Sequence, residues 1–387
     1  MKTEIDDLLS RAAGDADVPG VIACVSDRTG TLYEGGFGTR CLDQPTEMTP
    51  DTVVWIASMT KAITCAAAMQ LVDGGKLDLD TPAKSLIPHL GEVQVLEGFD
   101  AAGKPKLRPP SREMTLEHLL SHTAGFSYEI WNADIARYQQ AMGLPDINSG
   151  LDKALTTPLL FDPGARWEYG INIDWAGKLI EIASGQKLGE YLQENVLGPL
   201  GMQDTAFLIS PSMRERLATI HHRGVGSALT PDSAFEVPQA PEFESGGGRL
   251  YSTARDYLKF VRMMLNDGRS DDGETVLTSA AAARMSTNAI GSLNVPAMRT
   301  AIPQLSNDAD FFPGIEKRWS LGFMINDGVT PTGRSIGSLS WAGLSNSYYW
   351  IDQKKGIGGV FATQILPFFD QKALSLYNEF ERLAYRG

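Results

Sequence analysis

Hydrophobic and polar positions follow different periodicities in different parts of the chain. Residues 2–13 have the spacing of an amphipathic helix, which a Pro-Gly pair follows. Two short β-type runs come next, at 21–26 and 31–37, and the polar, Gly-ending segment 27–30 between them has the composition of a hairpin loop. The pattern therefore predicts a helix followed by two antiparallel strands.

A third apolar run, 53–57, leads directly into an alanine-rich segment. This segment extends to Val72, and two glycines follow it at 74 and 75, as expected at the C-terminal end of a helix. Because nearly all of its positions are apolar or small, we expect a buried helix over 58–72.

From about residue 81 to 244 the pattern changes. Stretches with helical spacing are joined by Pro- and Gly-rich loops, and β-type runs are scarce. The expected helices are 116–120, 173–183 and 188–196. We interpret this region as a mostly helical insertion.

After a long loop at 230–248, β-type spacing returns and a helical pattern closes the chain. The expected strands are 249–252, 320–326, 338–342, 347–352 and 356–363, and the expected helices are 253–265 and 371–385. The pattern predicts an α+β fold. One antiparallel sheet with flanking helices forms from 1–80 and 245–387, and 81–244 is a separate, mostly helical domain.

Composition supports a folded protein: 43% of the 387 residues are hydrophobic and 21% are charged. The net charge of −13 argues against nucleic acid or membrane surfaces as partners. The first residues carry three acids and no secretory apolar run, so we expect a cytoplasmic protein. Cys24, Cys41 and Cys65 are an odd count without C-x-x-C spacing, so we expect reduced, buried thiols and neither a disulfide framework nor a thiolate metal site.

Ser58 and Lys61 form a candidate catalytic pair. A serine hydroxyl needs a base within hydrogen-bond reach, and residues three apart on a helix share a face. A lysine exposed to water is protonated at neutral pH and cannot serve, whereas burial disfavours the ammonium form. The surrounding apolar segment is able to bury Lys61. A helix beginning at Ser58 would also present backbone N–H groups to a developing oxyanion. Because Ser-x-x-Lys also arises by chance, the pair alone does not establish catalysis.

Several short motifs, in order along most of the chain, strengthen this interpretation. They are WIASMTK at 55–61, GGKLDLD at 74–80, LLSHTAG at 119–125, PG at 163–164, WEY at 167–169, LGM at 200–202, GGG at 246–248, YST at 251–253 and WAG at 341–343. Together they resemble the serine β-lactamase-like esterases, and more narrowly the family VIII carboxylesterases, which are related to class C β-lactamases and DD-peptidases.

The resemblance implies roles for particular residues. Ser58 corresponds to the family nucleophile, Lys61 to its partner, and Tyr169 to the phenol that exchanges the proton with the nucleophile and leaving group. The backbone N–H groups of Ser58 and Leu344 would form the oxyanion hole. The substrate-binding residues expected from the motifs and nearby aromatics are Trp341, Ala342, Gly343, Tyr128 and Phe126.

Two departures from the β-lactamase pattern favour esters as substrates. Ile171 stands where the second motif has asparagine, which occurs one step later at Asn172. Trp341 replaces the lysine that binds the drug carboxylate, unless Arg249 or Arg334 restores a cation. We therefore expect hydrolysis of short- to medium-chain carboxylic esters through an acyl-enzyme on Ser58, without a cofactor.

Other functions remain open at this point. The same acyl-enzyme could transfer its acyl group to an alcohol or amine, or cleave a β-lactam or a D-amino-acid peptide. A non-catalytic peptide-binding module on the same fold is the alternative from another class. The sequence does not predict an oligomeric state.

Three further motifs receive structural interpretations. The segment GRSIG at 333–337 matches the G-x-S-x-G nucleophile elbow, but every histidine precedes Ser335, contrary to the order in α/β-hydrolases, so we expect a turn. His118 and His122 are four residues apart, yet Leu119 stands where a zincin has glutamate. We therefore expect a role at a helix end rather than in metal binding. The pair His221-His222 is interpreted as a solvated face.

Overall fold

The computed structural model describes residues 1–224, 226 and 228–386. Its main element is an eight-stranded antiparallel sheet with the order β10-β11-β12-β13-β14-β1-β2-β3. Strands from both ends of the chain meet at the β14–β1 pair, which confirms the predicted sheet. The strands are β1 (Gly20–Asp27), β2 (Thr31–Cys41), β3 (Gln44–Glu47), β10 (Lys317–Trp319), β11 (Met324–Asn326), β12 (Leu339–Gly343), β13 (Ser347–Asp352) and β14 (Ile357–Ala362).

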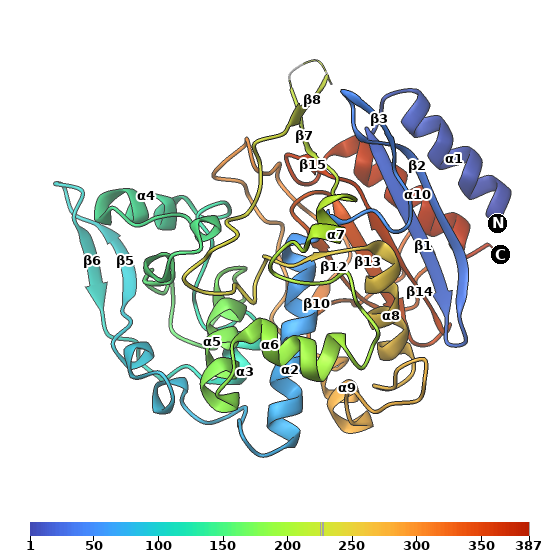
Figure 1. Ribbon diagram of the computed structural model, residues 1–387. Coiled ribbons are helices and arrows are strands. Elements are labelled where there is room, and N and C mark those ends of the chain that lie inside the picture. Colours follow the sequence, from blue (N-terminus) through green and yellow to red (C-terminus); the bar gives the residue numbers. More distant parts are fainter. Residues whose placement is uncertain (225, 227, 387) are drawn as a thin grey trace.

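Helices cover both faces of this sheet (Figure 1). On one face, α1 (Lys2–Gly14) packs against α10 (Gln371–Ala384) and β2. On the other face, α8 (Ala254–Leu265) packs against β1, β13 and β14. Helix α1 buries Ile5, Leu9 and Ala12, whose spacing of four and three residues places them on one side of the helix.

Helix α2 (Thr60–Asp73) lies between the sheet and the inserted segment (Figure 1). Almost all of its side chains are buried, as predicted, because it contacts α5 (Asn172–Ser184) on one side and α9 (Ser279–Met285) on another. Its small alanine side chains allow this close packing from several directions. The residues at the N-terminal end of this helix therefore lie in the centre of the molecule.

The inserted segment contains more β-structure than the sequence pattern indicated. A hairpin of β5 (Val95–Phe99) and β6 (Pro105–Arg108) projects from it (Figure 1). Strands β7 (Ile220–Arg223) and β8 (Leu229–Asp232) form a small sheet with β15 (Ile365–Leu366). Its helices, besides α5, are α3 (Leu116–Leu120), α4 (Ala133–Met142), α6 (Leu188–Leu192) and α7 (Pro211–Arg214).

The predicted strand at 249–252 is shorter than expected. Only β9 (Tyr251–Ser252) is extended, and it pairs with β4 (Val54–Trp55) instead of joining the large sheet. This two-stranded pair leads directly into the turn that precedes α2. It therefore fixes the start of the segment that carries Ser58.

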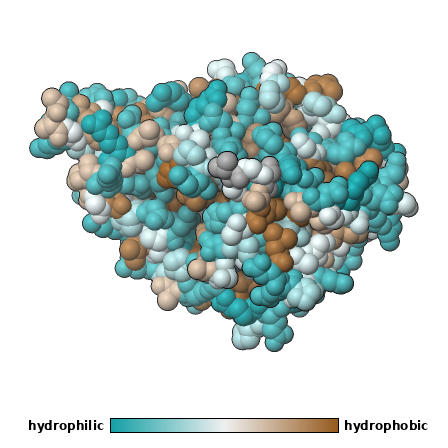
Figure 2. Space-filling model, turned by 90° about the horizontal axis from the view of Figure 1, so that it is seen from above, coloured by the Kyte–Doolittle hydropathy of each residue, from teal (hydrophilic) through white to brown (hydrophobic). Residues whose placement is uncertain are grey.

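Three observations concern the remaining expectations. No helix in the described residues is long and apolar enough to cross a membrane. The three cysteines are free and buried. Polar residues cover most of the face shown in Figure 2, with apolar residues in small separate groups.

Candidate active site

Ser58 lies in a 3₁₀ turn, η1 (Ala57–Met59), between β4 and α2. Ala57 has a φ of 45°, a left-handed conformation that is costly for a residue with a Cβ atom. The hydroxyl of Thr60 holds the turn, because it donates to Ala57 O at 2.6 Å and accepts from Leu250 N at 3.1 Å. The sharp turn places Ser58 on the wall of the apolar pocket described below.

Lys61 is fully buried and its Nζ lies 3.2 Å from Ser58 Oγ. The sequence prediction that the two groups meet in an apolar setting is thus matched by the geometry. The other partners of Nζ are Tyr128 OH, at 3.0 Å, and Gly247 O. A neutral amine has two N–H groups and one lone pair. When the N–H groups are donated to Tyr128 and Gly247, the lone pair faces the Ser58 hydroxyl.

Asp174 fixes the direction of these hydrogen bonds. It is fully buried on α5, and its carboxylate accepts from Tyr128 OH at 3.1 Å, from Gly247 N at 2.9 Å and from Ser245 Oγ. Burial, and next the charge of Asp174, raises the pKa of Tyr128 well above its ordinary value, so this phenol stays protonated. Its proton goes to Asp174, and its oxygen can therefore only accept from Lys61.

Asp174 was not among the residues predicted from the sequence. The available signal is an aspartate on the apolar face of a helix, where a charged side chain is expensive unless it is hydrogen-bonded. Gly247 belongs to the GGG motif at 246–248. A Cβ atom there would lie 2.4 Å from Asp174 Oδ2 and 2.7 Å from Tyr128 OH, so only glycine fits.

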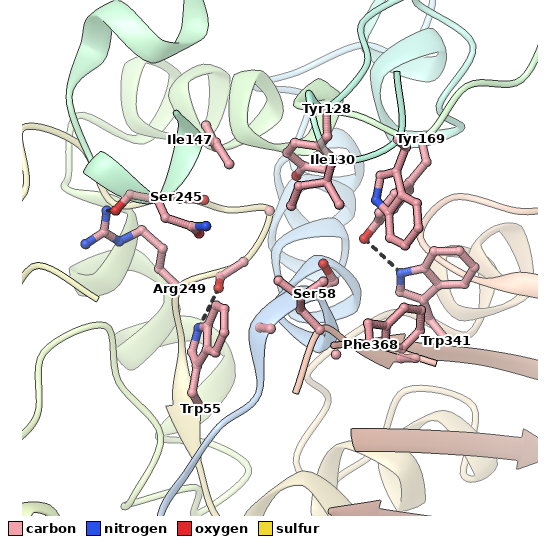
Figure 3. Close-up of a pocket in the computed structure, with 18 of the residues that line it drawn as sticks. Trp55, Ser58, Tyr128, Ile130, Ile147, Tyr169, Ser245, Arg249, Trp341 and Phe368 are labelled. Carbon is pink, nitrogen blue, oxygen red and sulfur yellow. Dashed lines mark hydrogen bonds between the residues drawn. The ribbon is translucent and has the colours of Figure 1, made fainter. Parts of the chain in front are cut away.

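Tyr169 lies on another side of the pocket, and its OH accepts from Trp341 Nε1 at 3.0 Å (Figure 3). Lys61 Nζ stands 4.7 Å from the centre of the Tyr169 ring. Trp341 was expected only to pack on the substrate. It also aims an N–H donor at the phenol oxygen, which stabilises negative charge on that oxygen. The role of Tyr169 in proton transfer remains a prediction.

Gly343 brings β12 close to the nucleophile turn. A Cβ atom at this position would lie 2.4 Å from Ile56 O and 3.6 Å from Ala57 Cβ. Glycine therefore allows the end of β12 to approach η1, so that Leu344 and Ser58 line the same pocket. This arrangement is the one that the predicted oxyanion hole requires.

Gly343→Ala is expected to lower kcat/KM by about 10² or more, because the added methyl displaces the Leu344 N–H from the oxyanion position. The variant is assayed on a p-nitrophenyl ester, with the melting temperature measured in parallel. Gly14→Ala is the matched control, since a Cβ atom at Gly14 meets nothing within 4 Å. Full activity in Gly343→Ala would contradict an oxyanion hole at Leu344.

The pocket is mainly apolar and aromatic, with an empty volume of about 590 Å³ including space open to solvent. Besides Ser58, its lining residues are Trp55, Ala57, Tyr128, Ile130, Trp131, Ile147, Asn148, Tyr169, Ser245, Gly247, Gly248, Arg249, Met298, Trp341, Ala342, Gly343, Leu344 and Phe368. Four of the five expected substrate-binding residues are included. Phe126 is not. It is fully buried and stacks against Trp175, because its segment passes behind the pocket wall.

Of the two polar groups that a β-lactam would use, the asparagine amide does not face this pocket. Asn172 is fully buried, and its side-chain amide lies 2.9 Å from His122 Nδ1 instead of facing the cavity. Arg334 forms a buried ion pair with Glu381 and does not line the pocket. Arg249 does line it, so one of the two arginines proposed from the sequence is placed to act on a ligand.

His118 and His122 have structural roles, whereas the interpretation of His221-His222 as a solvated face is wrong for His221, which is buried and accepts from Leu42 N at 3.2 Å. His118 Nδ1 accepts from Thr115 N at the start of α3, and burial lowers the pKa of His118 to about 4. Burial, and next the charge of Lys61, holds the pKa of His122 well below its ordinary value, so this ring is neutral among its aromatic neighbours. In the described part of the chain, no group of side chains has the composition of a metal site.

Ser335 lies in the loop between β11 and β12, where its backbone N–H donates to Asp352 Oδ2 at 2.8 Å. It is not part of the pocket wall. Ser335→Ala is therefore expected to leave kcat/KM for p-nitrophenyl butyrate within about two-fold of wild type, as for an ordinary surface substitution. A loss of several orders of magnitude would move the nucleophile to this position.

Comparisons with known proteins identify the family of the chain. The β-lactamase family model matches residues 5–381. The chain is 32% identical to a monacolin J acid methylbutanoyltransferase of Aspergillus terreus, over 97% of this chain and 93% of that protein. It is 30% identical to a lovastatin esterase of Penicillium rubens, over 99% and 98% of the two chains.

Structural comparison gives the same result. The unliganded simvastatin synthase of Aspergillus terreus superposes with a TM-score of 0.86 at 29% identity, covering 99% of this chain and 97% of that one. The predicted likeness to β-lactamase-like serine hydrolases is thereby confirmed. The chain belongs to the β-lactamase family.

Proposed function

We propose that the protein is a serine acyltransferase that takes an acyl group from an ester onto Ser58 and passes it to an alcohol, with hydrolysis when no acceptor is present. The observation that carries the proposal is the hydrogen bond of 3.2 Å between Lys61 Nζ and Ser58 Oγ inside a buried network. Ester hydrolysis was the main activity expected from the sequence. Several similar proteins are named as acyltransferases beside an esterase, and this favours transfer as the main reaction.

The arrangement supports a two-step reaction. Ser58 Oγ attacks the ester carbonyl as its proton passes to Lys61, and the backbone N–H groups of Ser58 and Leu344 bind the oxyanion. The C–O bond to the leaving alkoxide breaks, and the proton reaches this oxygen from Lys61 directly or through Tyr169. The acceptor hydroxyl then attacks the acyl-enzyme. Its proton is taken by the same groups, Ser58 regains a proton, and the new ester leaves.

The pocket wall favours an alcohol over water in the second step. Apolar and aromatic side chains such as Ile130, Met298 and Phe368 offer water few hydrogen-bond partners, whereas an organic acceptor buries apolar surface against them. The asparagine amide of the second motif does not face the cavity, so β-lactam cleavage should be weak.

Product analysis tests the proposal directly. The enzyme is incubated with p-nitrophenyl esters from acetate to laurate, with and without a primary alcohol, and the acid and the new ester are quantified. We expect the new ester to exceed the acid at high alcohol concentration while p-nitrophenol release persists without alcohol. Acid as the sole product at every alcohol concentration would instead assign a hydrolase, and rapid nitrocefin cleavage would assign a β-lactamase.

A further inference from the structure

Arg249 is a buried cation in the pocket that the proposed chemistry does not use. Its side chain is 3% exposed, and it lines the same cavity as Ser58. One guanidinium nitrogen donates to Asn148 O at 3.3 Å and another to Pro238 O at 2.7 Å. Among the described residues, no carboxylate lies within ion-pair distance of it. The guanidinium has five N–H donors, so several remain for a ligand.

Most of the other buried lysine and arginine side chains among the described residues contact a carboxylate. Arg262 contacts Asp271, Lys317 contacts Asp310, and Arg334 contacts Glu381. Apart from Arg249, only Lys61 of this group lacks a carboxylate contact, and Lys61 belongs to the catalytic network. The two buried lysine and arginine side chains of the described core that lack a carboxylate contact thus both lie at the active site, and a buried charge without a partner is costly.

The charges around Arg249 are compatible with the binding of an anion. Burial is the largest cause that lowers the pKa of Arg249 from its ordinary value, and Tyr251, Asp174 and Asp146 only partly oppose it from a distance. An arginine remains cationic under these conditions. Asn148 lines the same end of the pocket, and its side-chain amide has no hydrogen-bond partner among the described residues. The cation and the amide form a polar end in a cavity that is otherwise mainly apolar.

The position of Arg249 determines how far a bound ligand group lies from the carbonyl that reacts with Ser58. Its neighbours contact the nucleophile segment, since Trp55 Nε1 donates to Gly248 O at 2.9 Å and Ile56 N donates to Leu250 O at 3.1 Å. From there the side chain extends away from Ser58, on the side of the pocket opposite Tyr169 and Trp341 (Figure 3). A group held by the guanidinium therefore lies several bonds from the carbonyl that Ser58 attacks.

We propose that Arg249 binds a carboxylate of the substrate, several carbons from the reacting group. The inference rests on the proposed acyl-transfer function and specifies its substrate class: an acyl donor or an alcohol acceptor that carries a carboxylate. A planar carboxylate matches the guanidinium with two parallel hydrogen bonds and supplies the charge that the fold itself does not provide.

The test compares matched substrates on the full chain. On the acyl side, mono-p-nitrophenyl esters of dicarboxylic acids from succinate to suberate are compared with their methyl p-nitrophenyl diesters. On the acceptor side, ω-hydroxy acids are compared with their methyl esters as acceptors of a butyryl group from p-nitrophenyl butyrate. The readout is the kcat/KM for the carboxylate substrate divided by the kcat/KM for its neutral partner. Both values are measured on the same protein variant, so a general loss of activity does not change the ratio.

We expect this ratio to be about ten- to a hundred-fold above one for at least one chain length on one of the two sides, as for a charge-assisted hydrogen bond. The side that shows it identifies whether donor or acceptor carries the carboxylate. In Arg249→Gln the ratio should fall to one or below, and Arg249→Lys should retain part of it. Arg255→Gln is the matched control, because Arg255 pairs with Glu34 at the surface, and its ratio should equal that of wild type.

If Arg249→Gln does not fold, the wild-type enzyme provides the same comparison. Its inhibition by free dicarboxylates is compared with its inhibition by the corresponding diamides, and the dicarboxylates are expected to bind more tightly. A wild-type ratio near one on both sides, or a ratio that Arg249→Gln leaves unchanged, would overturn the inference, while transfer of the butyryl group to a neutral alcohol would uphold the proposed function. Absence of turnover with every ester would overturn the proposed function itself.

Discussion

Ser58→Ala should lower the turnover of p-nitrophenyl butyrate by about 10⁵ to 10⁶, which is the scale found when the nucleophile of a serine hydrolase is removed. The reason is structural as well as chemical. The hydroxyl of Ser58 faces the lone pair of Lys61 Nζ at 3.2 Å, and alanine leaves the amine without a proton to accept. The measurement is p-nitrophenol release, with single-turnover detection of an acyl-enzyme by mass spectrometry.

A fluorophosphonate probe gives an independent readout of the same prediction. Wild-type protein should gain one covalent adduct on the peptide that contains Ser58, and Ser58→Ala should gain none. The control is Ser335→Ala, which should be labelled like wild type because Ser335 lies outside the pocket. A wild-type protein that resists the probe and hydrolyses no ester would favour the alternative of a non-catalytic peptide-binding module.

The part of the site that could be predicted is the part that is local in sequence. Ser58 and Lys61 are three residues apart, and the apolar composition of α2 predicts the burial of Lys61. The pairing of strands from both termini could also be predicted, because β-type runs occur at both ends of the chain with helical spacing between them. Here local periodicity and fold agree, as expected when one face of each element must be buried.

The remaining part depends on contacts between residues far apart in the chain. Asp174, Tyr128 and Gly247 come from three separate segments, and nothing in the neighbourhood of any one of them indicates the other two. The hydrogen bond from Trp341 to Tyr169 could not be predicted either, because the two residues are far apart in the sequence and only the fold brings them together. Phe126 was misplaced for the same reason: composition identifies an aromatic residue but not the side of a wall on which it packs.

The structure contains two phenols near Lys61, and substituting each separately should distinguish their roles. Tyr169→Phe is expected to lower kcat by about 10³, within the range for loss of a general acid–base group. Its hydroxyl lines the pocket and receives the indole N–H of Trp341, so it can hold negative charge while the proton moves to the leaving group. The measurement is kcat for esters whose leaving alcohols span a range of pKa values, since poorer leaving groups should suffer most.

Tyr128→Phe removes the same atom from the other phenol and is the matched comparison. The hydroxyl of Tyr128 is already occupied by Asp174 and Lys61, so it positions the amine and does not transfer a proton to substrate. We expect a loss of only about 10- to 100-fold, as for misplacement of a catalytic group, with nearly the same factor for good and poor leaving groups. If instead Tyr128→Phe shows the strong dependence on the leaving group and Tyr169→Phe does not, the proton passes through Tyr128, and the role that the family resemblance gives to Tyr169 is wrong for this chain.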